Sequence, residues 1–235
     1  MRSIWRTLDR DLARDVGLVC LADCLVGVSY GAITVSSGFP LWAPMLLSLL
    51  VFAGASQFMF VGIVASGGNP LAAVVAGLLV NARHVPFGFA VGDVLGKRWA
   101  SRLAGSHLMI DESVAFALAQ KDAHRRRAAY WACGIGLFVC WNLGVLAGAF
   151  AGTAISDTGV FGLDAAFPAV LLALVLPSLK DRAARLPVLI GVVVALATTP
   201  FLPAGLPVLL ALVGVLAGIA AKEPGERTRE LAEVR

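Results

Sequence analysis

The sequence predicts an all-α, polytopic integral membrane protein, on the basis of its composition, its long uncharged runs and the spacing of its basic residues. The hydrophobic fraction is 59%, the charged fraction is 14% and the mean hydropathy is +0.85, all far from the averages of soluble domains. No Asp, Glu, Lys or Arg occurs from Cys24 to Ala82. We expect about seven to eight hydrophobic helical segments with a broken third helix. The transmembrane domain should span 16–221, between an N-terminal segment 1–15 and a tail 222–235.

The basic residues indicate the orientation in the membrane. A formal charge of +4 and a pI of about 9.1 are also found in nucleic-acid-binding proteins. Here, however, the basic residues form short clusters between apolar runs, such as Lys97-Arg98 and Arg125-Arg126-Arg127. This is the pattern of cytoplasmic loops in membrane proteins. It predicts that both termini are cytoplasmic and that no nucleic acid is bound, and it places Asp157 and Asp164 in an outside loop.

The first two predicted spans are Val16 to Val35 and Ala43 to Ser66, separated by a turn at Ser36 to Pro40. The first is about 30 Å long as a helix, which matches the hydrocarbon core. It carries Asp23, which is either a carboxyl held near the interface or a proton-carrying or substrate-facing group.

The second span contains the run Phe52-Ala53-Gly54-Ala55-Ser56-Gln57-Phe58. In lipid, Gln57 must find hydrogen-bond partners. The run is either packing between helices or a thinned helix whose exposed carbonyls bind a polar ligand.

The third segment is interrupted at Asn81-Ala82-Arg83-His84-Val85-Pro86-Phe87-Gly88. An arginine in the middle of a spanning helix costs about 3 kcal/mol on insertion scales, so it requires a partner or a purpose. Pro86 removes one donor and frees backbone polar groups near Ala82. Two geometries fit Leu71 to Leu95, a single kinked crossing or a re-entrant hairpin.

The segment Ser101 to Gln120 has apolar residues on both sides of Asp111-Glu112. If Leu71 to Leu95 crosses the membrane, this segment must cross back and bury two adjacent carboxyls. If Leu71 to Leu95 turns back, the charge rule places Gly96 to Ala128 in the cytoplasm.

The rest of the chain predicts four further apolar segments, at Ala128 to Ser156, Ala165 to Leu179, Leu186 to Thr199 and Leu206 to Ala221. A faint repeat relates Val16 to Ser66 and Ala128 to Leu179, in the same orientation. The four cysteines lack metal-site spacing and are expected to be small packing residues, so no metal or other cofactor is predicted.

These motifs resemble the AzlC family of branched-chain amino-acid permeases. The resemblance rests on Gly27-Val28-Ser29-Tyr30-Gly31, the Phe52 to Phe58 run, Asn81-Ala82-Arg83-His84-Val85 with Gly88, and Ile110-Asp111-Glu112-Ser113 with Phe116. It implies the large subunit of a two-component exporter of valine-like amino acids in a bacterial inner membrane, working with a small hydrophobic AzlD-type subunit. It also implies that the helix of Asp111-Glu112 enters the membrane.

A zwitterionic substrate needs one group for its carboxylate and another for its ammonium. In this hypothesis Arg83 binds the carboxylate, while Asp111, Glu112 or carbonyls near Gly54 to Gln57 bind the ammonium. His84 carries a coupling proton. The alternative for Arg83 is a permanent ion pair with Asp111 or Glu112. The predicted substrate site comprises Gly54, Ser56, Gln57, Asn81, Arg83, His84, Asp111 and Glu112.

Two other function classes are open. An intramembrane hydrolase would use Ser56 as nucleophile and His84 as base, but no third member of such a triad is visible and Gly54-Ala55-Ser56-Gln57 lacks the final glycine of a rhomboid-like run. The other class is a passive channel or an assembly subunit. The residues favour a transporter and not an enzyme.

Overall fold

The computed structural model describes residues 9–154, 178–180, 182–202 and 206–221, together with residues 172 and 176, and every element in these ranges is helical. They fall into two compact units. The first comprises Met1–Val61 and Gly77–Phe167, and the second comprises Gly62–Ala76 and Pro168–Arg235.

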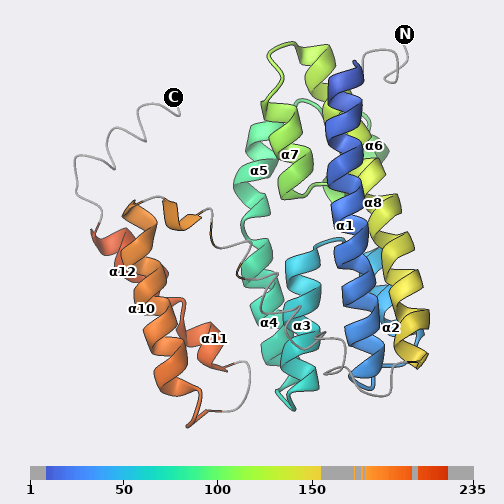
Figure 1. Ribbon diagram of the computed structural model, residues 1–235. Helices are drawn as coiled ribbons and strands as arrows, with labels where there is room; N and C mark the ends of the chain where they lie inside the picture. Colours follow the sequence, from blue (N-terminus) through green and yellow to red (C-terminus); the bar gives the residue numbers. More distant parts are fainter. Residues whose placement is uncertain are drawn as a thin grey trace. The chain divides into compact units, whose positions relative to one another are not determined.

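Residues 10–154 form eight helices (Figure 1). They are α1 (Arg10–Ser36), α2 (Trp42–Leu50), α3 (Gly54–Ala65), α4 (Pro70–Asn81), α5 (His84–Val91), α6 (Trp99–His107), α7 (Asp111–Leu118) and α8 (Ala123–Ala154). The end of α3 and the beginning of α4 belong to the second unit.

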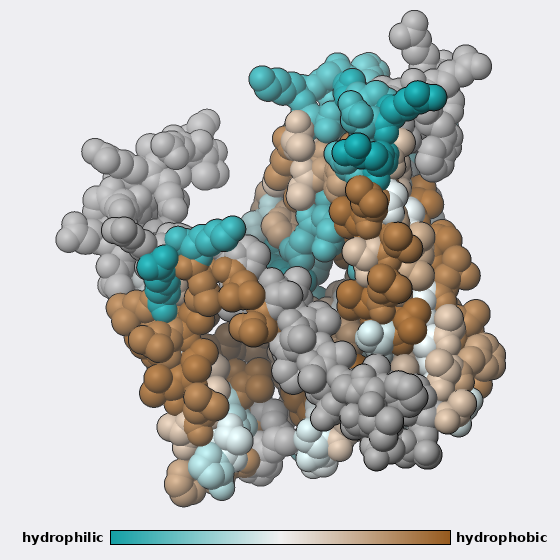
Figure 2. All heavy atoms as spheres, viewed as in Figure 1, coloured by the Kyte–Doolittle hydropathy of each residue, from teal (hydrophilic) through white to brown (hydrophobic). Residues whose placement is uncertain are grey.

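Within the part of the chain that the structure describes, three stretches are long and apolar enough to cross a membrane, namely Arg10–Ser36, Pro70–Val91 and Ala123–Ala154. The outward face of α1 is apolar, because Leu18, Leu21 and Leu25 are each more than half exposed at helical spacing. Figure 2 shows hydrophilic residues gathered at one end of the first unit, with apolar surface below it. We call this the basic end, since Arg125 and Arg126 near the start of α8 pair there with Asp9 and Asp93. Such a surface suits a lipid environment.

Helices α1 and α8 pack in parallel along their length, with small residues between them (Figure 1). At the basic end, Arg125 Nη2 lies 2.5 Å from Asp9 Oδ2. Further along, a Cβ added at Gly27 would lie 2.8 Å from the Trp141 carbonyl oxygen, and one at Gly152 would lie 2.8 Å from the Ala32 carbonyl oxygen. Only glycine allows backbones to approach this closely. The shared direction agrees with the faint repeat in the sequence.

The expected single span Ala43 to Ser66 is instead two half-helices, α2 and α3, separated by Val51–Ala53. Ser48 of α2 is hydrogen-bonded to Asn142 of α8, and Phe52 contacts Phe138 halfway along α8. The chain then reverses, since Phe58 of α3 packs against Tyr30 and Trp141, back toward the end where α2 began (Figure 1). The prediction of one crossing was therefore wrong, and the helix is interrupted at Val51–Ala53, just before the Gly54 to Gln57 run.

Helices α4 and α5 form one interrupted stretch, as the sequence predicted, with the break at Ala82 and Arg83. The stretch Pro70–Val91 runs on in one direction rather than turning back (Figure 1). Pro86 lies in the first turn of α5, where its missing N–H removes no helical hydrogen bond. Of the two geometries predicted for Leu71 to Leu95, the structure therefore has the single kinked stretch and not the re-entrant hairpin.

Helices α6 and α7 form a second re-entrant pair, which starts and ends at the basic end. Tyr130 Oη donates to the Gly105 carbonyl oxygen at 2.7 Å, near the start of α8, while His107 contacts Phe138 halfway along α8. After the break at 108–110, α7 returns, and Val114 and Ala117 join the buried cluster around Tyr130. Neither sequence alternative for Ser101 to Gln120 is right, because the segment enters the bundle without crossing it.

In the second unit, α10 (Arg182–Thr198) packs against α11 (Leu206–Leu210) and α12 (Val213–Ala221), with the short turn η3 (Ser178–Lys180) before them. A Cβ at Gly191 would lie 2.9 Å from the Ala211 carbonyl oxygen, so these helices also touch through a small residue. The expected outside loop at Asp157 and Asp164, most of the return at 165–179 and the tail 222–235 lie outside the described residues.

Candidate functional site

The three helix breaks of the first unit meet at one open cavity of about 270 Å³. The tip of the α2–α3 pair arrives from one end of the bundle, the tip of the α6–α7 pair arrives from the basic end, and the α4–α5 break lies beside them. The cavity is lined by Leu50, Val51, Phe52, Ala53, Asn81, His84, Ser106, His107 and Met109. It combines apolar side chains with polar groups and backbone ends, as small-molecule sites do.

Gln57 makes the first break tolerable inside a membrane. Its side chain is almost fully buried, and its Nε2 donates to the Val51 carbonyl oxygen at 2.7 Å and lies 3.4 Å from that of Leu47. The Leu47 carbonyl oxygen already accepts the Val51 N–H at 2.8 Å, whereas the Val51 carbonyl oxygen, just after α2, accepts no backbone hydrogen bond within the described residues. An unpaired backbone group in lipid costs several kcal/mol. The glutamine therefore supports the break and faces α2, and it does not line the cavity.

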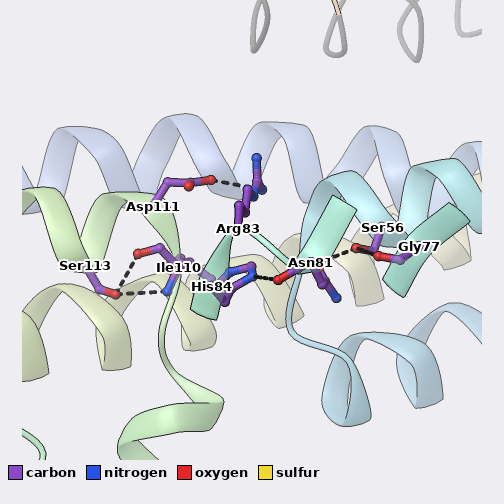
Figure 3. Close-up of polar contacts among 8 residues, drawn as sticks. All are labelled: Ser56, Gly77, Asn81, Arg83, His84, Ile110, Asp111 and Ser113. Carbon is purple, nitrogen blue, oxygen red and sulfur yellow. Dashed lines mark hydrogen bonds and ion pairs between the residues drawn. The ribbon is translucent and has the colours of Figure 1, made fainter. Parts of the chain in front are cut away.

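The second break is supported by His84 and Ser56. His84 Nδ1 lies 3.0 Å from the Asn81 carbonyl oxygen at the end of α4. Ser56 Oγ lies 2.6 Å from Asn81 Oδ1 and 3.1 Å from the Gly77 carbonyl oxygen, and it can donate its one hydrogen to either (Figure 3). The break thus brings Asn81 and His84 to the cavity wall, with Ser56 directly behind Asn81.

The third break is supported by Ser113, a fully buried residue of α7. Its Oγ accepts the Ile110 N–H at 3.0 Å and lies 3.1 Å from the Leu108 carbonyl oxygen and 3.0 Å from that of Ile110. Gly134 of α8 makes room for this turn, because a Cβ there would lie 3.1 Å from the Leu108 carbonyl oxygen. Each break therefore has at least one side chain that satisfies its backbone.

Arg83 and Asp111 form an ion pair of 2.9 Å between Nη2 and Oδ2, with each side chain 35% exposed. In Figure 3 the Arg83 side chain points away from Asn81 and His84. Neither Arg83 nor Asp111 lines the cavity. The Nε of Arg83 is buried without a partner among the described residues. The pair ties the α4–α5 break to the first turn of α7 and leaves one guanidinium donor unused.

Glu112 faces a different neighbour from Asp111. It is close enough to Asp23 of α1 for the two carboxyls to repel each other, and both also influence the buried thiol of Cys133. Arg83 and His84 also interact electrostatically with Glu112. The adjacent acids thus differ in environment, one paired with a cation and the other opposite a second carboxyl.

An aromatic wall closes the cavity against α8. The ring centroids of Phe52 and Phe138 are 5.1 Å apart. The ring centroid of His107 lies 5.6 Å from that of Phe138 and 6.4 Å from that of Phe52. These contacts join the two re-entrant tips.

Sequence reasoning missed Phe52, His107 and Met109 as lining residues, and it missed Ser113 as a support. The signal for Ser113 was its place in the Ile110 to Ser113 motif, three residues after the N-cap residue Ile110.

Some of the predicted site residues line the cavity, and others do not. Asn81 and His84 line the cavity, and Ser56 is one hydrogen bond away from it. Gly54 begins α3 beside Trp141, whose Cη2 would lie 3.0 Å from an added Cβ. Gln57, Arg83, Asp111 and Glu112 lie around the breaks without lining the cavity.

The hydrolase alternative requires Ser56 and His84 to share a hydrogen bond. Among the described residues, Ser56 Oγ is bonded to Asn81 and Gly77, and His84 Nδ1 is bonded to the Asn81 backbone. The serine and the histidine are therefore engaged with Asn81 rather than with each other. This arrangement does not activate a nucleophile.

Known proteins share this part of the chain. A family model described as AzlC protein matches residues 19–155, which include all three breaks. An uncharacterised membrane protein of Archaeoglobus fulgidus is 32% identical over 169 residues, 71% of this chain and 74% of that protein. The branched-chain amino acid transport protein AzlC of Bacillus subtilis is 32% identical over 88 residues, 37% of this chain and 35% of that protein.

The inner membrane protein YgaZ of Escherichia coli is 30% identical over 165 residues, 66% of this chain and 62% of that protein. No solved structure matches. The family match covers more than half of the sequence, and the relatives are membrane proteins. The chain therefore belongs to the AzlC protein family and is a multi-pass membrane protein.

Proposed function

We propose that this protein transports branched-chain amino acids, of the size of valine, and exports them from the cell as the large subunit of a two-component permease. The observation that carries the proposal is the meeting of three helix breaks at one cavity inside a membrane bundle. Broken helices with opposed half-helices are how many secondary transporters build a binding site near the bilayer midplane.

The cavity suits a small amino acid. Its volume of about 270 Å³ is slightly below the range of about 300–1,000 Å³ that is typical of sites for drug-sized ligands. Leu50, Phe52 and Met109 offer an apolar surface for an aliphatic side chain, while Asn81 and the two histidines offer polar groups. A zwitterion with an apolar side chain needs both kinds of surface.

The substrate class, the direction and the partner rest on similarity. The Bacillus subtilis relative is named as a branched-chain amino acid transport protein, and its likeness extends over 37% of this chain. Export and a small hydrophobic AzlD-type subunit are part of the same proposal. Exposed leucines of α1 and α8 give the first unit an apolar surface for lipid and for such a subunit.

Counterflow of labelled valine in proteoliposomes tests the proposal. A carrier exchanges labelled for unlabelled valine, a channel shows flux without exchange, and a hydrolase shows neither. We expect counterflow by the wild-type protein, in the presence of an AzlD-type small subunit, and loss of counterflow in Ser106→Trp, which places an indole in the cavity.

Leu103→Trp is the matched control, because Leu103 lies on the same helix, is 64% exposed and does not line the cavity. It should exchange valine at the wild-type rate. Wild-type protein that exchanges no branched-chain amino acid, with or without the small subunit, would contradict the proposed function. Equal activity of Ser106→Trp and Leu103→Trp would show that the substrate does not use this cavity.

A further inference from the structure

Two imidazoles are the only titratable side chains among the residues that line the cavity. Asn81 and Ser106 are polar but uncharged, and the nearest guanidinium, that of Arg83, is turned to Asp111. A substrate carboxylate in this cavity therefore finds positive charge only on His84 or His107. In a water-poor site, a carboxylate without a charged or hydrogen-bonding partner is unfavourable.

The backbone fixes which nitrogen of His84 carries hydrogen. Nδ1 lies 3.0 Å from the Asn81 carbonyl oxygen, and a carbonyl oxygen can only accept. Nδ1 is therefore the donor, and in the neutral ring Nε2 holds a lone pair. Such a nitrogen repels a carboxylate oxygen, whereas the protonated ring donates an N–H from Nε2. Carboxylate binding at Nε2 thus requires a protonated His84.

His107 is held by ring contacts alone. It ends α6, packs against Phe52 and Phe138, and makes no hydrogen bond within the described part of the chain. Both of its nitrogens remain available to a ligand, and the neutral ring already supplies one N–H.

We propose that His84 and His107 together bind the substrate's carboxylate, and that binding takes up one proton from solvent onto Nε2 of His84. The inference rests on the proposed transport function and specifies the chemistry of its site. It gives the protein a means of coupling substrate to protons at the binding step. The Nε2–H bond formed with the proton from solvent is the only bond that changes, and the proton returns to solvent when the substrate leaves.

Several titratable groups belong to the electrostatic surroundings of His84. From α7, Glu112 interacts electrostatically with His84, and Asp111 is already paired with Arg83. From α1, Asp23 faces Glu112, and α8 contributes the Cys133 thiol near both acids. The cavity residues of the α2–α3 tip have no titratable side chain. His107 and Glu112 are therefore the other groups whose titration could produce the same pH dependence, and the variants His107→Phe and Glu112→Gln separate them from His84.

Binding of labelled valine to the full-length protein in lipid nanodiscs, from about pH 5.5 to about pH 8.5, tests the proposal around the range in which histidine titrates. We expect the Kd of the wild-type protein to rise up to about tenfold per pH unit toward the alkaline side, because one proton is bound with the substrate. Isobutylamine, which lacks the carboxylate, should show no such slope when it competes with valine. An equal slope for isobutylamine would overturn the proposal without any variant.

Substitutions distinguish the role of His84 from that of His107. His84→Gln supplies a permanent N–H donor and should bind valine with a flat pH profile. His107→Phe keeps the ring contacts and should retain the slope with Kd raised about tenfold or more, the value of a hydrogen bond to a charged group. His124→Gln, at an exposed position of α8, should match the wild type.

Two outcomes would overturn the proposal. In one, the slope persists in His84→Gln and disappears in Glu112→Gln. In the other, His107→Phe binds valine as tightly as the wild type. Failure of the wild-type protein to bind valine at any pH would instead count against the proposed function, so the two failures are distinguishable.

Discussion

At the scale of single residues, the polar side chains inside the membrane segments serve the backbone first. Gln57, His84 and Ser113 each hold groups that a helix break leaves unpaired. Without water, such groups must be satisfied by the protein. A polar motif in an apolar run can therefore indicate a break as directly as it indicates a ligand. His84 does both, since its other nitrogen remains for the cavity.

The Arg83–Asp111 pair gives a prediction at this scale. Because the pair joins the α4–α5 break to α7, we expect Arg83→Gln to lower the free energy of unfolding by roughly 1–3 kcal/mol, chiefly by leaving Asp111 without its cation. The double variant Arg83→Gln with Asp111→Asn should recover part of that loss. Thermal unfolding in detergent measures both.

The sequence hypothesis assigns Arg83 to the substrate carboxylate, and the same variants test it. Arg83→Lys keeps the charge but loses the fork that binds a carboxylate with two N–H groups. A substrate ligand would lose valine counterflow at unchanged stability. A structural pair would keep the transport rate per folded molecule, which is the outcome that the present geometry favours.

At the scale of helices, glycines decide how α1 and α8 meet. A Cβ at Gly148 would overlap the Val28 backbone, and one at Gly31 would lie 2.7 Å from the Ala149 nitrogen. We expect Gly148→Leu to separate the helices and lower the free energy of unfolding by roughly 1–3 kcal/mol, the usual cost of overpacking. Thermal unfolding of the purified protein would show it as a lower Tm.

Gly17→Leu is the matched control. Gly17 lies on the outer side of α1, where an added Cβ meets nothing within 4 Å. Its Tm should equal or exceed that of the wild type, since leucine favours helix more than glycine does. Equal losses at Gly17 and Gly148 would mean that the loss does not come from the α1–α8 contact.

Helix positions were largely predictable from the sequence, whereas their directions were not. The interrupted stretch around Arg83 was predicted because Pro86, Arg83 and His84 are strong local signals. The α2–α3 break has no proline and no charge, and its two half-helices together have the length and hydropathy of one span. Hydropathy measures apolar length and does not record a reversal, so the cavity between the tips could not be foreseen.

At the scale of the whole molecule, the basic end holds together helices that are far apart in sequence. Arg125 of α8 is bonded to Asp9 at the start of α1, and Arg126 is paired with Asp93 after α5 at 3.4 Å. Trp131 Nε1 donates to the Val94 carbonyl oxygen at 3.1 Å. At the basic end, where the α6–α7 pair starts and ends, these contacts join α8 to the start of α1 and to the segment after α5. Loss of these contacts is therefore expected to destabilise the whole bundle.

The contribution of this end depends on pH through Asp9. The hydrogen bond from Arg125 lowers the pKa of Asp9 below its ordinary value of 3.8, and the bond from the Leu12 N–H acts in the same direction. A carboxyl whose pKa is lower in the folded state stabilises it above the unfolded pKa. That stabilisation is lost as the pH falls through the folded pKa. It should thus be complete at neutral pH, begin to decline near pH 3.8 and disappear in stronger acid, below the folded pKa.

Asp9→Asn isolates the charge, because asparagine still caps the first turn of α1. We expect a Tm below that of the wild type at neutral pH and low salt, and a difference that vanishes both in strong acid and in about 1 M salt, where exposed charges are screened. Asp15→Asn is the control, since Asp15 pairs only with its neighbour Arg14 on the same helix. If Asp9→Asn and Asp15→Asn lower the Tm equally, the link between α1 and α8 does not contribute. If the loss persists in acid, the asparagine acts through something other than the missing charge.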